Sequence, residues 1–352
     1  MLLDAMGLSP SQKKWVADAL MHGALSGHPG QGQGFDKLPR MWQRIQAKTI
    51  DLHARVETRA QGSTWALWEA HNGLGIQVAA QAMEAAVEQA KEQGMGAVFV
   101  RGSTHLSSAG FHALLAAEKG LLGLCMTNAG PEMAPWGGTT PILGTNPWGM
   151  AVPTTGPFPL LLDIALTQSG KGMVRWHQEQ GLPIPTHWAF APDGSTTDDP
   201  TQALAGTLVP IGEYKGVGLS FMTDVLCGVL TGAAFGQDCY ADPKRHNVGH
   251  VLMAIAPERF MARELFYQRL EEFCRQYKSS ETMQGVSEVY LPGELEYLRK
   301  RERLRQGIPV SSSALEALNQ LAQELDVSCQ LVMTGTKGQD EGAMRMGSGH
   351  TS

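Results

Sequence analysis

The chain has 352 residues, of which 43% are hydrophobic and 18% are charged, and its formal net charge is -6. This composition is that of an ordinary globular protein, and it excludes an intrinsically disordered chain and a basic nucleic-acid-binding protein. At about 150 residues per domain, the length predicts two lobes. No apolar run reaches ~18 residues and no apolar stretch near the N-terminus resembles a signal peptide, so we expect no contact with a membrane.

Cysteine usage bears on the cellular compartment and on metal binding. The five cysteines are scattered and include no CxxC pair; they are Cys125, Cys227, Cys239, Cys274 and Cys329. An odd, scattered set suits neither a disulfide framework nor a thiolate metal cluster. The sequence therefore predicts a cytoplasmic protein without a metal site.

The N-terminal part of the chain is predicted to be helical. Residues 9–24 begin with a Ser-Pro pair, which is typical of a helix cap followed by proline at the first helical position. A glycine-rich loop covers residues 26–34, after which Leu38 and Met41 begin a second helical stripe. Residues 1–70 are therefore assigned to the N-terminal part of a helical lobe.

The middle of the chain alternates between helices and buried strands. Residues 75–94 are rich in alanine with a period of about 3.6 and end on glycine, and the strand-type run GAVFVRG follows almost at once. The same alternation recurs before residue 260. The pattern predicts an α/β domain over residues 71–260.

The last third of the chain contains helical stretches at residues 261–280, 293–307 and 311–327, with no strong strand among them. We expect these helices to pack onto the N-terminal ones, so that residues 261–331 complete a lobe built from both chain ends. Residues 332–352 lack hydrophobic periodicity and are predicted to be disordered.

The usual short catalytic signatures are absent: there is no GxGxxG after a strand, no P-loop, no HExxH and no GxSxG. Glycine, proline, asparagine and histidine gather instead in segments near the ends of predicted strands. These segments are RGSTHLSSAG (101–110), TNAGPEMAPWGG (127–138), GTNPWGMAVP (144–153), LDIALTQSGKG (162–172) and EYKGVGL (213–219). Because α/β proteins bind ligands in loops at strand ends, these segments form the candidate site.

Taken in order, the segments closely resemble the malate/L-lactate dehydrogenase-like oxidoreductases. This family lies outside the Rossmann-type dehydrogenases and includes ureidoglycolate, sulfolactate and diketogulonate enzymes and the Δ1-piperideine-2-carboxylate reductases. The resemblance spans nearly the whole chain, from NGLG (72–75) to GHVLMAIAPERF (249–260), VYLPGELE (289–296) and RQGIP (305–309).

The resemblance implies an α/β fold in which a central mixed-sheet cofactor domain of non-Rossmann type adjoins a helical lobe formed by both chain ends. It also implies a homodimer, a small-molecule carboxylate substrate, and NADH or NADPH as the cofactor.

The family's cofactor-binding positions can be carried over to this chain one by one. They fall on Ile164, Ala165, Leu166, Thr167, Gln168, Ser169 and Gly170, with further contacts from Lys171, Tyr214, Lys215, Gly293 and Glu294. A pyrophosphate requires backbone N–H groups and a cation, and TQSGKG offers hydroxyls, glycines and Lys171 within one turn. The alternative for Lys171 and Lys215 is that both are solvated surface lysines.

Three further positions match the active cleft of the family. His105 follows the run GAVFVRG, where the family carries a histidine. Its ordinary pKa near neutrality suits the polarisation of a substrate oxygen or the transfer of a proton, and the alternative is a structural histidine that orders the loop. Met126 and Thr145 match substrate-pocket positions of the imine-reducing members, with a core methionine and a strand-end cap as the alternatives.

The chain departs from the family pattern in the N-terminal glycine-rich loop. The family carries Ser-His-Gly and, four residues after the histidine, an arginine followed by a hydrophobic residue and proline; the histidine supplies a proton and the arginine holds the substrate carboxylate. An alignment anchored on Leu38-Pro39 places Gln33 on the histidine and Lys37 on the arginine. An alignment anchored on Gly27 places Gln31 on the histidine instead. Glutamine has no titratable proton, and lysine offers a point charge without the bidentate fork of arginine.

The loss of the histidine bears on the substrate. Reduction of a ketone must deliver a proton to the developing alkoxide, whereas the nitrogen of a cyclic or secondary ketimine is already protonated in the reactive iminium. The first hypothesis is an NAD(P)H-dependent reductase that transfers hydride to the carbon next to the carboxylate of a small 2-imino or 2-oxo acid. In this hypothesis His105 lies nearest the chemistry and Gln33 orients the reacting group, while Lys37 and Thr145 hold the carboxylate.

Two other hypotheses remain. The chain could be an ordinary 2-hydroxy acid dehydrogenase of the malate/lactate type, with His105 or His28 as the proton donor. It could also be a redox-silent homologue that acts as a binding or structural subunit.

Overall fold

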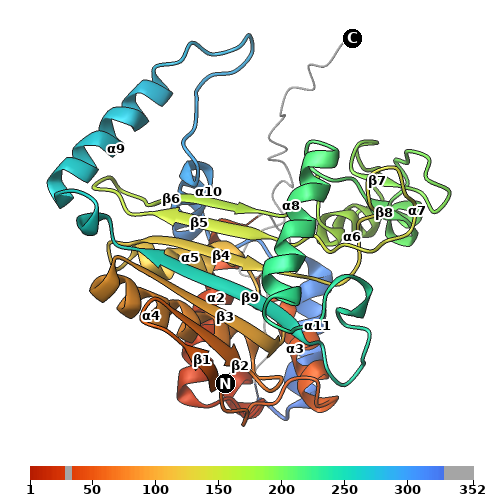
Figure 1. Ribbon diagram of the computed structural model, residues 1–352. Coiled ribbons are helices and arrows are strands. Elements are labelled where there is room, and N and C mark those ends of the chain that lie inside the picture. The colour runs from red at the N-terminus through yellow and green to blue at the C-terminus, as the bar shows by residue number, and fades with distance from the viewer. Residues whose placement is uncertain (28–33, 329–352) are drawn as a thin grey trace.

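A mixed β-sheet of seven strands forms the centre of the molecule (Figure 1). The computed structural model describes residues 1–27 and 34–328. Within them the strand order is β1-β2-β3-β9-β4-β5-β6, in which β2 and β3 are parallel and all other neighbours are antiparallel. The strands are β1 (Glu57–Gln61), β2 (Trp65–Glu69), β3 (Met95–Ser103), β4 (Leu122–Thr127), β5 (Trp148–Val152), β6 (Leu160–Ile164) and β9 (Val248–Ile255). The sheet confirms the predicted α/β class.

Helices surround the sheet, and a two-stranded ribbon of β7 (Ala189–Phe190) and β8 (Thr207–Leu208) lies apart from it. The N-terminal helices are α1 (Leu2–Ala5), α2 (Pro10–Ser26) and α3 (Lys37–Gln46). The middle of the chain forms α4 (Gly75–Gln93), α5 (Ala109–Ala117), α6 (Lys171–Glu179), α7 (Pro200–Ala205) and α8 (Tyr214–Asp224), which continues into the π-helical turn η2 (Val225–Val229). The 3-10 turns η3 (Gly236–Asp238) and η4 (Pro257–Arg259) and the C-terminal helices α9 (Arg263–Lys278), α10 (Glu294–Gln306) and α11 (Ser312–Glu324) follow.

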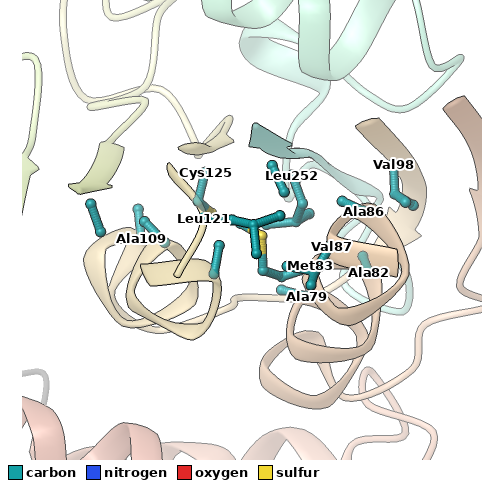
Figure 2. Close-up of a cluster of buried hydrophobic side chains, with 14 of the residues drawn as sticks. Ala79, Ala82, Met83, Ala86, Val87, Val98, Ala109, Leu121, Cys125 and Leu252 are labelled. Carbon is teal, nitrogen blue, oxygen red and sulfur yellow. The ribbon is translucent and has the colours of Figure 1, made fainter. Parts of the chain in front are cut away.

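Helices α4 and α5 cover one face of the sheet through small side chains. The buried alanines of α4 other than Ala80, and those of α5, lie with Met83, Val98 and Leu252 in one buried cluster (Figure 2). The helices approach the strands so closely that a Cβ atom on Gly149 of β5 would lie 2.3 Å from the carbonyl carbon of Ala109. A glycine in β5 and alanines in the helices therefore set the distance between the two layers.

A second core joins the two ends of the chain. Trp15 and Leu20 of α2, Leu38 of α3, and Leu318 and Leu321 of α11 belong to one buried cluster. Helix α10 is fixed to α2 by hydrogen bonds from the guanidinium group of its Arg303 to the carbonyl oxygens of Ala24 and Gly27, each 2.7 Å long. The predicted lobe formed by both chain ends is confirmed for α10 and α11.

The structure differs from the expected organisation in two places. Strands β1 and β2 join the main sheet although they lie within residues 1–70, which we assigned to helices. Helix α9 was expected to pack onto the N-terminal helices, but it has no buried residue and projects away from them (Figure 1). Residues 332–352, predicted to be disordered, lie outside the described residues. Among the described helices, none is long and apolar enough to cross a membrane.

Candidate active site

The candidate site lies at the edge of the sheet where β3 and β4 end and β9 begins. Both strands pair antiparallel with β9, so their carboxyl ends meet at this edge. The ring of His250 in β9 connects the strand ends, because its Nδ1 lies 2.8 Å from the hydroxyl oxygen of Thr127 and its Nε2 lies 2.9 Å from that of Ser103. This arrangement fixes the start of the loop that carries His105.

His105 is held in one tautomer by its own loop. Its Nδ1 accepts a hydrogen bond from the backbone N–H of Ser107 at 2.9 Å, so the neutral ring carries its proton on Nε2. Burial, and then the positive charges of Lys37, Arg44 and Arg40, hold the pKa of His105 well below its ordinary value. At neutral pH the imidazole is therefore uncharged and offers one N–H donor.

The residues of α3 that act electrostatically on His105 are cations. Lys37, Arg40 and Arg44 are spaced at about one helical turn and lie on one face of the helix. Across the described chain, no carboxylate forms an ion pair with any of these three residues. Burial lowers the pKa of Lys37 to about 8, and the charges of Arg40, Arg44 and Arg175 act in the same direction while Asp36 opposes them. This face suits an anionic ligand.

Further polar side chains complete this group, which we call the basic cluster: Lys37, Arg40, Arg44, His105, Glu132, Tyr240 and His246. The guanidinium carbon of Arg44 lies 5.7 Å from the ring centroid of Tyr240, whose ring is 4.5 Å from that of His246. Burial raises the pKa of the Glu132 carboxyl group, against the charges of Lys171, Arg175, Arg40 and Lys37. The basic cluster therefore joins α3 to the loops after β3 and β4 and to the loop before β9.

Sequence reasoning missed five members of the basic cluster. Arg40 and Arg44 could have been found, because they repeat the position of Lys37 one and two turns along the helix. Glu132 lies in the segment TNAGPEMAPWGG, which was part of the candidate site although this residue was not named, whereas Tyr240 and His246 lie in a loop without a pattern. Tyr240 also has a left-handed backbone, with φ of 62°, which is rare for a residue other than glycine.

The predicted cofactor segment lies beside Thr145 and the chain before α8. The N–H of Leu166 donates to the carbonyl oxygen of Thr145 at 2.8 Å, and the carbonyl oxygen of Leu166 accepts from Ile211 at 3.1 Å. The N–H of Gln168 donates to Val209 at 2.8 Å. Leu166 is fully buried and uses both backbone groups, so it positions the segment, whereas the Gln168 side chain is exposed. Ile164 and Ala165 are half-buried, and Thr167 is buried with its hydroxyl donating to Ser169.

The end of this segment opens α6. Gly170 is the N-cap residue and supplies no side-chain cap, the first turn contains no acidic residue, and Lys171 is the first helical residue. A Cβ atom on Gly170 would meet nothing within 4 Å, so the space beside it is open. Uncapped N–H groups beside a lysine suit a phosphate. Tyr214 and Lys215, at the start of α8, are exposed.

Gly293 and Glu294 lie at the start of α10, where the chain passes next to β6. Gly293 caps α10 with φ of 85°, and a Cβ atom there would approach the Leu161 backbone nitrogen to 2.9 Å, so only glycine fits. The Glu294 carboxylate accepts hydrogen bonds from the Lys278 ammonium at 2.7 Å and from the N–H of Leu291 at 2.8 Å. Gly293 thus allows the start of α10 to approach β6, and Glu294 joins the start of α10 to the end of α9.

The remaining predicted residues are less directly placed at the site. Met126 is 4% exposed and packs with Cys227 and Val251 in a small core cluster. Thr145 is half-buried next to the cofactor segment. Gln31, Gln33 and His28 lie outside the described residues.

Comparison with known proteins identifies the family to which this chain is similar. The family model described as "Malate/L-lactate dehydrogenase" matches residues 1–319. The malate dehydrogenase of Pyrococcus abyssi is 35% identical over 335 residues, which cover 93% of this chain and 92% of that protein. The (2R)-3-sulfolactate dehydrogenase (NADP(+)) of Chromohalobacter salexigens is 32% identical over 305 residues, which cover 86% and 88% of the two chains.

A solved structure extends the similarity to a reductase. The crystal structure of Δ1-piperideine-2-carboxylate reductase from Pseudomonas syringae pvar. tomato matches with a TM-score of 0.79 and 28% identity, over 91% of this chain and 96% of that one. The similarities in sequence and in structure thus agree with the resemblance that the order of the segments along the chain had indicated. The chain belongs to the malate/L-lactate dehydrogenase family of NAD(P)-dependent oxidoreductases.

Proposed function

We propose that the protein reduces a small 2-oxo or 2-imino acid, by hydride transfer from NADH or NADPH to the carbon next to the carboxylate. The observation that carries this proposal is the basic cluster, in which three cations of α3 have no carboxylate ion-pair partner in the described chain and act electrostatically on His105, whose ring is neutral. The cations attract the substrate carboxylate, and the Nε2–H group of His105 can donate to the reacting oxygen or nitrogen.

The cofactor fits the open end of α6. The N–H groups of Gly170 and the following residues, with the Lys171 ammonium, suit the pyrophosphate, and the exposed side chains of Gln168, Tyr214 and Lys215 are available for the rest of the molecule. When bound, the nicotinamide supplies the hydride. Lys171 acts electrostatically on Glu132, which lies in the basic cluster, so this end of α6 adjoins the proposed substrate position.

Both 2-oxo and 2-imino substrates have support among the relatives. The names of the two dehydrogenases point to malate and sulfolactate, and the name of the solved reductase points to a cyclic ketimine. If hydride transfer to an iminium is the reaction, Gln33 only orients the substrate, and Gln33→Ala lowers the rate about fivefold, corresponding to one hydrogen bond of about 1 kcal/mol. The alternative alignment requires the same substitution at Gln31.

We further propose a cytoplasmic homodimer. Helix α9 has no buried residue and leaves Leu265, Phe273 and Tyr277 exposed at 45%, 63% and 46%. An isolated helix of this length is marginal in water, so a second copy of the chain is the natural partner for this face. The four cysteines of the described chain are free thiols, in keeping with a reducing compartment.

A substrate panel tests the proposal. Purified protein is mixed with NADH or NADPH and with pyruvate, oxaloacetate, Δ1-piperideine-2-carboxylate, or pyruvate plus methylamine, and oxidation of the cofactor is followed by absorbance. The proposal expects turnover of at least one substrate with one cofactor. Cofactor binding without turnover on any substrate would favour a redox-silent homologue.

A further inference from the structure

The proton that accompanies reduction of a 2-oxo acid needs a donor, and the described cluster contains few candidates. Arginine does not release its proton near neutral pH, so Arg40 and Arg44 can hold an anion but cannot act as acids. The neutral ring of His105 carries one proton, on Nε2. Loss of that proton would leave an imidazolate anion, so His105 can polarise the substrate without protonating it.

Lys37 combines the required position with the required chemistry. It shares a face of α3 with Arg40 and Arg44, and it acts electrostatically on both His105 and Glu132. We propose that the ammonium group of Lys37 donates the proton to the substrate oxygen, while Arg40 and Arg44 hold the substrate carboxylate. The inference rests on the proposed function.

This division of roles follows from the charges around Lys37. An ammonium group paired with a carboxylate has its pKa raised and becomes a poorer acid. The charged and titratable groups that interact electrostatically with Lys37 are Asp36 at the N-cap of α3, Arg40 and Arg44 on α3, Arg175 on α6, His105 after β3 and Glu132 after β4. Burial, and then the charges of Arg40, Arg44 and Arg175, lower the pKa of Lys37, and these guanidinium groups are available to bind the substrate carboxylate in its place. The resulting pKa of about 8 is close to the working pH, as general acid catalysis requires.

In the proposed step, the C–H bond at carbon 4 of the reduced nicotinamide would supply the hydride for the new bond to carbon 2, and the carbonyl π electrons would move to oxygen. An N–H bond of Lys37 breaks as the O–H bond forms, which leaves a neutral amine that water reprotonates. Reduction of an iminium substrate bypasses this transfer, because its nitrogen already carries the proton.

The test compares Lys37→Arg, Lys37→His and the control Lys91→Met, which changes an exposed lysine on α4. Wild-type reduction of 2-oxo acids should lose rate above a pH of about 8, following the pKa of Lys37. Lys37→Arg should lower kcat about 10²- to 10⁴-fold and abolish this loss of rate at alkaline pH. Lys37→His should move the pH at which the rate falls toward about 6.5. Reduction of Δ1-piperideine-2-carboxylate should change less than about fivefold.

A second readout does not depend on activity. Lys37 should react with trinitrobenzenesulfonate at a half-maximal pH near 8, when its peptide is quantified by mass spectrometry. A loss of rate that persists near pH 8 in Lys37→Arg, or a half-maximal pH for Lys37 near the ordinary lysine value of about 10.4, would overturn the inference alone. A wild type inactive toward every substrate would overturn the proposed function and this inference with it.

Discussion

At the scale of single residues, hydrogen bonds and neighbouring charges determine which protonation state each side chain holds. The N–H of Ser107 occupies Nδ1 of His105, and cations on α3 keep its ring neutral. A histidine predicted from sequence as either an electrophile or a proton donor thus has the geometry of a hydrogen-bond donor. Lys37, expected only to hold the carboxylate, has the lowered pKa of an acid.

The N-terminal residues of α6 provide a prediction at the same scale. Lys171→Glu should weaken nicotinamide cofactor binding about 10- to 100-fold, because it replaces an attractive charge with a repulsive one where a charged hydrogen bond contributes ~1.5–3 kcal/mol. Gly170→Val should weaken binding by filling the open space beside the N-cap. Isothermal titration calorimetry measures both, with Lys91→Glu as the control. Unchanged affinity in both variants would place the cofactor elsewhere.

At the scale of elements, local periodicity predicted most of the central domain. The helix–strand pairs α4–β3 and α5–β4 appear where alanine-rich helical patterns precede short apolar runs. Strand β1 was missed because it is a fully exposed edge strand, so it has no apolar alternation. The surface on which a helix packs depends on contacts distant in sequence, which explains the wrong expectation for α9. The same dependence on contacts distant in sequence explains why Tyr240 and His246 were not predicted.

Helix α9 carries the prediction for assembly. Phe273→Asp should convert the proposed dimer to a monomer, because it places a charge in the exposed apolar face of α9, while Phe273→Leu should leave the dimer intact. Size-exclusion chromatography with light scattering measures the mass. A wild-type chain that is monomeric at micromolar concentration would contradict the proposed dimer.

At the scale of the whole molecule, buried neutral histidines link stability to pH. Burial lowers the pKa of His112 to about 4 and that of His250 to about 3. The unfolded chain binds these protons below about pH 6.5 and the folded chain does not, so stability is complete above that pH and is lost as the pH falls. Each residue should lower the free energy of unfolding by about 1 kcal/mol between pH 7 and pH 5.5.

Urea unfolding at the two pH values measures this loss. His112→Gln, which retains an amide donor for the carbonyl oxygen of Leu106, should reduce the loss by the contribution of one histidine. An equal loss in the variant and the wild type would show that His112 does not titrate on unfolding.

The central claim is hydride transfer to the carbon next to a carboxylate, and isotope transfer tests it most directly. The protein is incubated with each substrate of the panel and with NADH or NADPH that carries deuterium at carbon 4 of the nicotinamide, in separate samples for the two faces. Mass spectrometry and NMR then locate the label in the product. The account predicts one deuterium at carbon 2 of a 2-hydroxy or 2-amino acid, from one face only. The account would be contradicted if no product contained deuterium, whichever face of the nicotinamide was labelled and whichever substrate was used.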